Sequence, residues 1–490
     1  MKNMKFLPLM LLNYKQLRSN LEYKDCIGKV MIVCYTIQDT NISIFGNLGS
    51  LEFLKNNNAQ GYNGEIFIEE NIIYCAVGQL NNDEFQEKDS WEIQRSMGAV
   101  WKKISQYYNK YEVEFNEWNG VSNCYYGFIL ASYKYVYLNK ENQTAQIQLN
   151  LIINEKYRDI IEIAHSQNIA RFLGDTPANL MTPTIFIEYA KDILQNYNDI
   201  ELRVLEENDI QKLGMNCLYS VGQGSKENTK LLALKYIGNK NVSIHKVAMV
   251  GKGVTFDSGG ISLKPSLNMH QMRYDMMGAA LMLMSFECAC KLKLNINVSC
   301  TIPLVENLPS GSATKPGDVF IAMNKLSVEV GNTDAEGRLI LADAIEYAQT
   351  QYNEKPEFLI DTATLTGAML IALGNVYCGY FTNSNEFNTL IENAANDSEE
   401  YLWRLPLSKY YTNQLKSIIA DINNIGGRMA GSITAAEFLH KFVANDIKWA
   451  HFDIAGLMDE GLISEIYGKG ATGRPLPTFI NILKKLQFNN

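Results

Sequence analysis

Two short segments of the chain concentrate acidic and basic side chains among glycines. The first runs from Val250 to Lys264 and reads VGKGVTFDSGGISLK, and the second runs from Gly331 to Arg338 and reads GNTDAEGR. Asp334 and Glu336 in the second segment are two residues apart, so in an extended chain their carboxylates would project from the same side. That spacing suits joint ligation of one metal ion.

If the two glycine-containing segments and the segment around Asp275 lie close together in the fold, their charged residues form one site. The set then comprises four carboxylates and two lysines: Asp257, Asp275, Asp334, Glu336, Lys252 and Lys264. So many buried charges are unstable together unless they are paired, whereas two divalent cations would neutralise the carboxylates. The residue types therefore predict a site for two metal ions.

Other interpretations of these residues are weaker. A single Asp beside glycines is most often a turn or cap residue, and the segment at 251–253 lacks the full phosphate-loop pattern. Asp257 to Gly260 is similar to the nucleophile segment of trypsin-like proteases, but those need a fold of two β-barrels. The chain has five histidines and no HExxH motif, which excludes the ordinary zincin route to peptide hydrolysis. His451, inside an apolar strand, is predicted to be a core histidine.

The elements that would position these residues alternate between strands and helices. Apolar strands are predicted at 231–234, 247–250, 296–302, 358–360 and 449–454, and helices at 279–292, 339–352 and 435–443. This alternation predicts a mixed, largely parallel sheet with helices on both faces, in which ligands bind beyond the carboxyl ends of the strands. The fold class is therefore α/β.

The chain length of 490 residues suggests two to four domains. We expect a smaller α/β domain over 1–150, with strands at 30–35 and 71–77 and a helix at 91–108. A linker follows over 151–178, with one helix from Glu155 to Leu173 that is ended by the segment 174–177, and the catalytic domain spans 179–490. The apolar residues 6–12 are predicted to form a first strand rather than a signal peptide.

Composition limits the partners and the location. The net charge is −9 and no run of Lys and Arg compensates it locally, which disfavours nucleic-acid and anionic-membrane binding. Nine cysteines without a CxxC pair indicate reduced thiols in a cytoplasmic protein. No apolar stretch approaches the roughly 20 residues that a membrane span needs.

Five segments closely resemble the leucine aminopeptidases, the cytosol aminopeptidase family. They are residues 250–260, 272–280, 332–339, 361–368 and 451–456, and the sequence NTDAEGRL at 332–339 is that family's signature. The resemblance extends from about Ala170 to Gly473. Met277 is a departure, because the family usually has Gly or another small residue there.

The resemblance implies a metal-dependent exopeptidase that removes the first, leucine-like residue from peptides with a free amino terminus. Lys252, Asp257, Asp275, Asp334 and Glu336 match the ligands of two metal ions, and Asp257 and Glu336 match the shared ones. Zinc is expected, although manganese, magnesium or cobalt also suit carboxylates. Lys264 and Arg338 match the catalytic side chains, with a bicarbonate ion at Arg338 as general base. The family also implies a homohexamer.

The chemistry of such a site follows from its charges. Two metals about 4 Å apart can hold a hydroxide, polarise the scissile carbonyl and bind the free α-amine, while a lysine stabilises the oxyanion. The positions that match the first-residue pocket are Met272, Thr364, Leu365, Gly367, Ala455 and Met458. Two alternatives stay open at this stage: a non-catalytic structural paralogue of the same fold, and a peptidase with an added nucleic-acid-binding role.

Overall fold

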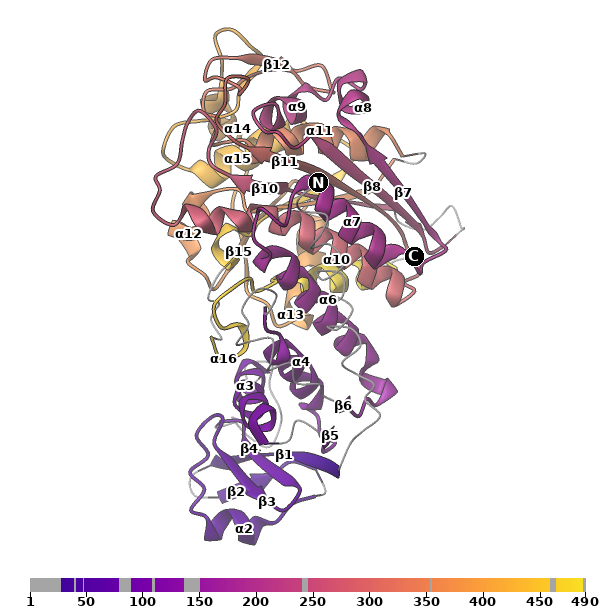
Figure 1. The fold of residues 1–490 in the computed structure, drawn as a ribbon, viewed down its shortest axis with the longest axis vertical. Helices are drawn as coiled ribbons and strands as arrows, with labels where there is room; N and C mark the ends of the chain where they lie inside the picture. The colour runs from indigo at the N-terminus through magenta and orange to yellow at the C-terminus, as the bar shows by residue number, and fades with distance from the viewer. Residues whose placement is uncertain are drawn as a thin grey trace. The chain divides into compact units, whose positions relative to one another are not determined.

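The computed structural model describes residues 28–38, 41–46, 48–78, 90–107, 111–135, 150–239, 246–352, 355–458 and 464–487. They form two compact units (Figure 1). The smaller unit contains the described residues up to Ile169 together with 464–469, and the larger contains Ala170 to Met458 and the residues from Gly470 onward. Among the described residues, no helix is long and apolar enough to cross a membrane. The strand predicted at 6–12 lies outside them.

The smaller unit is an α/β fold, as predicted. Its described strands are β1 (Gly28–Gln38), β2 (Asn41–Ile44), β3 (Ile66–Glu69), β4 (Ile72–Ala76), β5 (Tyr111–Phe115) and β6 (Asn150–Leu151), in the order β3-β4-β1-β5-β6 with β2 beside β1. Its helices are α2 (Leu51–Asn56), α3 (Ser90–Tyr107), α4 (Val121–Ser132) and the short α16 (Ser464–Tyr467). The helices α3 and α4 pack against each other, and a side chain at Gly127 would collide with the backbone of Gln94.

The larger unit contains a mixed sheet whose order is β16-β15-β18-β14-β9-β11-β8-β7, with β10 beside β11. The strands are β7 (Ile200–Leu205), β8 (Lys230–Ile237), β9 (Lys246–Gly251), β10 (Gly253–Asp257), β11 (Asn297–Asn307), β14 (Phe358–Ala363), β15 (Cys378–Thr382), β16 (Leu402–Arg404) and β18 (Lys448–Asp453). A small second sheet contains β12 (Val319–Ile321), β13 (Ser327–Glu329) and β17 (Ile422–Asn423).

The centre of the large sheet is parallel, as the alternating pattern predicts. The strands β18, β14, β9 and β11 run parallel, whereas β8 pairs antiparallel with β11 and β7, and β15 pairs antiparallel with β18. Every residue of β14 is buried, and five of the six in β9 are. Burial on both faces explains why these strands are continuous apolar runs rather than alternating ones.

Helices cover both faces of this sheet (Figure 1). On one face α10 (Met277–Lys291) packs on β9, β11 and β14 and is itself covered by α7 (Pro183–Leu194) and α17 (Leu476–Leu486), with α13 (Asn385–Asp397) beside α17. On the other, α11 (Gly337–Thr350) lies between α9 (Asn216–Gly222) and α15 (Gly431–His440). Because α10 is enclosed on all sides, nearly every residue in it is buried and it shows no polar face.

The strand β11 continues to Asn307, five residues beyond the predicted end at 302. Pro303 suggests a strand end because proline cannot donate a hydrogen bond to a central ladder. Here its position is tolerated, because pairing with β9 ends at Thr301 and pairing with β10 begins at Leu304. The extension carries Asn307 to the edge where β10 also ends.

The helix predicted over 155–173 is also longer than expected. A 3-10 turn at Glu155–Tyr157 leads into α6 (Arg158–Asp175), which extends two residues past the predicted last residue, Leu173, and ends within the segment 174–177 predicted to end it. A side chain at Gly174 would collide with the Sδ atom of Met277. The glycine therefore makes room for the large residue that departs from the family pattern at position 277.

Candidate active site

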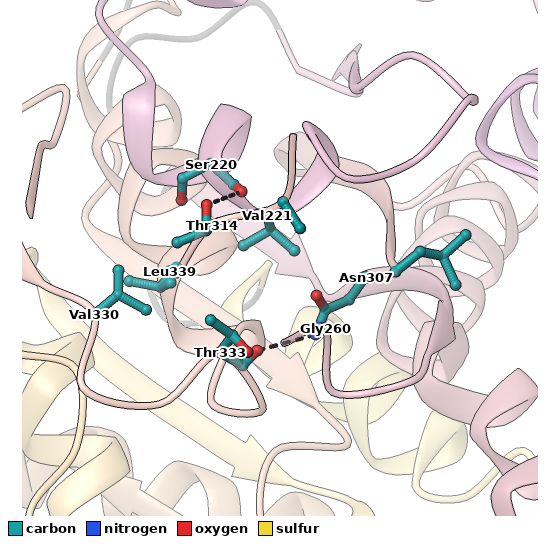
Figure 2. A pocket seen from close by; sticks show the side chains of 10 residues that line it. Ser220, Val221, Gly260, Asn307, Thr314, Val330, Thr333 and Leu339 are labelled. Atoms are coloured by element: carbon teal, nitrogen blue, oxygen red, sulfur yellow. Dashed lines mark hydrogen bonds between the residues drawn. The ribbon is translucent and has the colours of Figure 1, made fainter. Parts of the chain in front are cut away.

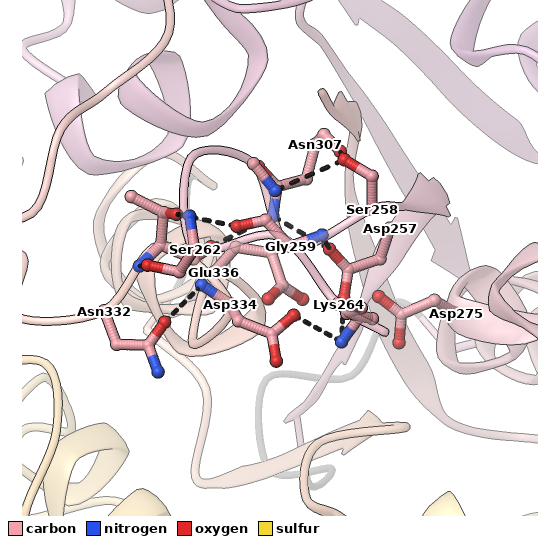
Figure 3. Close-up of polar contacts among 12 residues, drawn as sticks. Asp257, Ser258, Gly259, Ser262, Lys264, Asp275, Asn307, Asn332, Asp334 and Glu336 are labelled. Carbon is pink, nitrogen blue, oxygen red and sulfur yellow. Dashed lines mark hydrogen bonds and ion pairs between the residues drawn. The ribbon is translucent and has the colours of Figure 1, made fainter. Parts of the chain in front are cut away.

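Figure 3 shows Asp257, Lys264, Asp275, Asp334 and Glu336 close together, and Lys252 contacts two of them at the carboxyl ends of the parallel strands. Lys252 stands between β9 and β10, and Asp257 is the last residue of β10. Asp275 lies in the 3-10 helix η4 (Met269–Met276), and Glu336 is the N-cap residue of α11. Residues some 80 positions apart therefore meet at one edge of the sheet.

Lys252 connects one pair of carboxylates. Its Nζ lies 2.6 Å from Asp275 Oδ1 and 2.8 Å from Glu336 Oε1, and it donates to the carbonyl oxygen of Thr364 at 2.8 Å. All three charged side chains are buried. A side chain at Gly337 would collide with the Lys252 stem, so glycine at the start of α11 is what lets the lysine reach this position.

Lys264 connects the other pair. Its Nζ lies 2.7 Å from Asp257 Oδ2 and 2.5 Å from Asp334 Oδ1. The second oxygen of Asp257 accepts hydrogen bonds from the backbone N–H of Gly259 and from Asn307 Nδ2, both at 2.8 Å. Gly259 adopts a φ of +86°, a conformation that favours glycine, and this turn brings its N–H back to Asp257.

Three carboxylates from two segments can reach one ion. Oxygens of Asp257, Asp334 and Glu336 lie within 4.8 Å of one another. The prediction that Asp334 and Glu336 share one side of an extended segment is wrong, because Thr333 and Asp334 form a turn and Glu336 has helical backbone angles. The turn, rather than the pleat of a strand, brings the two carboxylates together.

Burial and mutual repulsion perturb the acidic groups. Burial, together with the charge of Glu336, raises the pKa of Asp257 to about 6, and burial raises the pKa of Asp275 well above its ordinary value. Burial also opposes ionisation of Glu336, but the ammonium groups of Lys252 and Lys264 lower the pKa of that carboxyl. Without further positive charge, keeping all of these carboxylates ionised is unfavourable in free energy.

The two lysines are shifted by the same charges. Burial disfavours the charged ammonium of Lys252, but the carboxylates of Asp275 and Glu336 outweigh it and raise the pKa of the lysine. Lys264 behaves alike, with Asp257 as its strongest acidic neighbour. Metal ligation requires the uncharged amine of Lys252. An incoming cation would therefore have to displace a proton from the Lys252 ammonium group.

The donor set fits divalent metal ions. Four carboxylates face two ammonium groups, which leaves an excess of two negative charges when all are ionised. The Oδ2 atom of Asp275 is buried and has no hydrogen-bond partner among the described residues. Carboxylate oxygens with one amine nitrogen suit zinc, manganese, magnesium or cobalt.

Arg338 lies in the first turn of α11, two residues after Glu336. Its guanidinium is buried, and its Nη1 donates to the carbonyl oxygen of Asn424 at 2.6 Å. Its Nε has no partner among the described residues. Burial lowers the pKa of Arg338 to about 10, so the group stays charged at neutral pH.

The residues predicted to line the first-residue pocket come from three segments. Met272 lies in η4, Thr364, Leu365 and Gly367 follow β14, and Ala455 and Met458 follow β18. Gly367 is exposed and the other five are half-buried. Thr364 also touches the charged cluster, because its Oγ1 donates to Asp275 Oδ1 at 2.7 Å.

Asp453 at the end of β18 connects two of these segments. Its Oδ1 accepts the backbone N–H groups of Leu365 at 3.1 Å and Ala455 at 3.2 Å, and its Oδ2 accepts the hydroxyl of Thr366 at 2.6 Å. Within the described part of the chain, no hydrogen bond joins Met272 or Met458 to the other pocket residues. The described geometry thus unites Thr364, Leu365 and Ala455 more tightly than it does the two methionines.

Sequence reasoning missed two residues that fix the cluster. Asn307 donates to both Asp257 Oδ1 and the carbonyl oxygen of Thr333, and so ties the end of β10 to the turn before Asp334. Asn424 contacts the same turn from a segment 90 residues away. A polar residue at the end of a buried strand was the available signal for Asn307, but the predicted strand ended too early to show it.

A small cavity is lined in part by Gly260 (Figure 2). Its volume is about 10 Å³, close to the least that one water molecule needs, so it does not take a substrate. Its lining includes Ser220, Val221, Gly260, Asn307, Thr314, Val330, Thr333 and Leu339. The polar members bond to backbone carbonyls around it, Thr314 to Ser220 and Asn307 to Thr333.

A family model and the sequences of known proteins both match cytosol aminopeptidases. A family model described as "Cytosol aminopeptidase family, catalytic domain" matches residues 168–480. The cytosol aminopeptidase of Encephalitozoon cuniculi (strain GB-M1) is 42% identical over 487 residues, which cover 97% of this chain and 99% of that protein. The probable cytosol aminopeptidase of Rickettsia bellii (strain OSU 85-389) is 44% identical over 313 residues, 64% of this chain and 62% of that one.

Solved structures are similar over almost the whole chain. The cytosol aminopeptidase from Coxiella burnetii superimposes with a TM-score of 0.79 at 27% identity and covers 95% of this chain and 98% of its own. The bottromycin maturation enzyme BotP in complex with Mn superimposes with a TM-score of 0.81 at 25% identity and covers 94% and 99%.

Proposed function

The chain belongs to the cytosol aminopeptidase family and is a metal-dependent aminopeptidase, and from that premise we propose which of its residues perform the reaction. The observation that carries the proposal is the arrangement of two lysines, each between two carboxylates, at the carboxyl ends of the parallel strands. Its substrates are peptides with a free amino terminus, with leucine-like first residues preferred.

Lys252, Asp257, Asp275, Asp334 and Glu336 are proposed to hold two divalent cations. The ion pairs support two cation sites, because Lys252 joins Asp275 to Glu336 while Lys264 joins Asp257 to Asp334. In the proposal, Asp257 and Glu336 are shared, Lys252 and Asp275 complete one site, and Asp334 completes the other. Zinc is the first choice for both positions, and the Mn complex of BotP makes manganese a serious second.

When bound, the two cations supply positive charge that activates a water molecule, polarises the scissile carbonyl and anchors the substrate's free amine. Lys264 donates a hydrogen bond to the carbonyl oxygen as negative charge develops on it. In the described structure Lys264 binds the same carboxylates that a cation would bind. Metal loading would therefore release its ammonium group toward the substrate.

Arg338 is proposed to hold a bicarbonate ion, which would supply a general base when bound. Its guanidinium is charged and buried, and it lies at the start of α11, where backbone N–H groups favour an anion. The Nε without a described partner offers a donor for that anion. The carbonyl oxygen of Asn424 holds the opposite end of the guanidinium group.

Met272, Thr364, Leu365, Gly367, Ala455 and Met458 are proposed to receive the first side chain of the substrate. Most of these positions are apolar and of modest size, which suits a leucine-like residue. The link through Asp453 keeps the segments after β14 and β18 together and so supports a preformed pocket. The contact of Thr364 with Asp275 supports a pocket next to the proposed metal ligands.

Assembly and location are further proposals. A homohexamer is what the family resemblance implies, and exposed apolar side chains in the larger unit, among them Ile371, Ile418 and Met429, support contacts between subunits. The relatives named cytosol aminopeptidases support a cytoplasmic location. We also propose functional divisions at 1–150, 151–178 and 179–490, with catalysis confined to the last.

The test is release of the first residue from a panel of aminoacyl amides and dipeptides, with matched amino-acetylated substrates, before and after treatment with a chelator. We expect hydrolysis only at free amino termini, fastest with leucine and methionine, and lost on chelation. Equal hydrolysis of acetylated substrates, or full activity in the chelator, would refute the proposal.

A further inference from the structure

Asn424 is a fully buried amide that follows β17 and contacts the segment bearing Asp334. Its Oδ1 accepts the backbone N–H groups of Gly331 at 2.8 Å and Asn332 at 3.3 Å. Its Nδ2 donates to the carbonyl oxygens of Asn332 at 2.8 Å and Ala335 at 3.1 Å. The oxygen and the nitrogen of the Asn424 amide therefore both form hydrogen bonds with the segment 331–335.

The main chain of Asn424 is tied to two further elements. Its N–H donates to the carbonyl oxygen of Glu329 in β13 at 2.9 Å. Its own carbonyl oxygen accepts the hydrogen bond from Arg338 Nη1 at 2.6 Å. One residue therefore contacts the guanidinium of Arg338 with its backbone and the turn around Asp334 with its side chain.

The segment at 331–335 needs such a partner. It lies outside any helix or strand, so its partly buried backbone groups cannot bond within a regular element. An amide supplies an acceptor for two N–H groups and donors for two carbonyls, which neither Asp nor Leu can do. An Asp at this position would turn an acceptor toward the two carbonyl oxygens and add a negative charge near Asp334 and Glu336.

We infer that Asn424 is a positioning residue that sets both the carboxylate of Asp334 and the guanidinium of Arg338. The inference rests on the proposed function, because it gives those two groups their roles. Asn424 touches no reacting atom and acts through its hydrogen bonds alone. Loss of comparable supporting bonds at metal sites typically lowers metal affinity or activity by roughly 10- to 100-fold.

A merely structural asparagine provides the matched control. Asn383 also bonds to backbone on both sides of its amide, donating to the carbonyl oxygen of Ile447 at 2.9 Å and accepting the N–H of Trp449 at 2.8 Å. These bonds lie at the start of β18, whereas the cluster lies at the carboxyl ends of the strands. Asn383→Asp should therefore lower stability without changing the chemistry.

The experiment compares Asn424→Asp, Asn424→Ala and Asn383→Asp in the full chain. Thermal unfolding and circular dichroism report the fold, competition with a chelator reports the affinity for Mn²⁺, and leucine amide hydrolysis at saturating Mn²⁺ reports kcat and KM. For both Asn424 variants we expect Mn²⁺ affinity and kcat to fall by roughly 10- to 100-fold, with KM changed by less than about threefold. For Asn383→Asp, affinity and kcat should stay within about threefold of the wild type.

Three results would overturn the inference. They are Asn424 variants that fold and keep both Mn²⁺ affinity and kcat, equal losses in the Asn383→Asp control, or failure of both Asn424 variants to fold, which would make the residue a fold requirement. Failure of the proposed function is distinct, because it would appear in the wild type as absence of metal-dependent hydrolysis.

Discussion

Two buried polar clusters in the same sheet differ in their balance of charge. In the middle of β14 and β18, Asp361 accepts hydrogen bonds from Trp449 Nε1 at 2.6 Å and pairs with His451 Nδ1 at 2.5 Å, and all three residues are fully buried. One carboxylate there faces two nitrogen groups. At the carboxyl ends of the strands, four carboxylates face two lysines.

The difference shows that burial of titratable groups does not by itself mark a reactive site. Asp361 and His451 are direct neighbours in the strand register, so their contact is one that the sheet itself provides. The carboxylates at the strand ends come from three separate segments and leave negative charge without compensation. Excess charge at the edge of the sheet, rather than burial, distinguishes the cluster that can bind metal.

Removal of a carboxylate from the strand-end cluster should have the largest effect. Asp334→Ala or Glu336→Ala is expected to abolish hydrolysis and lower metal content, because each removes ligand charge while the sheet core is untouched. Activity, metal analysis and thermal unfolding provide the measurement. Asp446→Ala, at an exposed carboxylate paired with Lys355, is the control. Near-normal turnover with full metal content in either site variant would refute the assignment.

Lys264→Ala should separate transition-state stabilisation from metal binding. Turnover is expected to fall by roughly a hundredfold, while metal content stays unchanged because Lys264 is not a proposed ligand. Steady-state kinetics on metal-loaded protein, with metal analysis of the same sample, provide the measurement. A variant whose main defect was loss of metal would place Lys264 among the ligands instead.

Asp361→Asn should affect stability and leave chemistry alone. The substitution exchanges one acceptor oxygen for an amide and leaves a buried N–H group of Trp449 or His451 without a partner, at a cost of about 1–3 kcal/mol in the free energy of unfolding. Denaturant unfolding measures the loss, and kcat of the folded variant should equal that of the wild type. A large fall in kcat at unchanged stability would show that the mid-strand cluster is part of the active site.

Asp343 should make a smaller contribution to the free energy of unfolding, and this contribution should depend on pH. It lies in α11, accepts the N–H groups of Leu218 and Met323, and burial raises its pKa to about 7. The folded state thus holds this proton more tightly than the unfolded chain, so the stabilisation is fully present below pH about 4 and is lost as the pH rises to about 7. Over that range, the stability of the wild type relative to Asp343→Asn should fall with rising pH by up to about 1.4 kcal/mol per unit.

Denaturant unfolding of both proteins in the same buffers checks this, because their difference cancels effects of metal release that they share. A difference in the free energy of unfolding that stays constant from pH 4 to 7 would contradict the raised pKa.

The sequence predicts the parallel centre of the large sheet, because strands such as β9 and β14 are buried on both faces and their apolar runs are local. Most of the charged residues of the cluster are also visible in sequence, since Lys252, Asp257 and Lys264 lie in one glycine-rich segment and Asp334 and Glu336 in another. The contributions of Asn307 and Asn424 are not, because a hydrogen bond to a segment 26 or 90 residues away leaves no local pattern. The same holds for Gly174, whose role depends on the side chain of Met277.

The most direct test of the central claim is titration of the chelated wild-type protein with Zn²⁺ or Mn²⁺, with bound metal and leucine amide hydrolysis measured on each sample. The account predicts that activity returns as metal fills the cluster, reaches its maximum at two ions per chain, and does not return in Glu336→Ala. Full activity in protein shown to be free of metal, or equal recovery in the Glu336 variant, would contradict it.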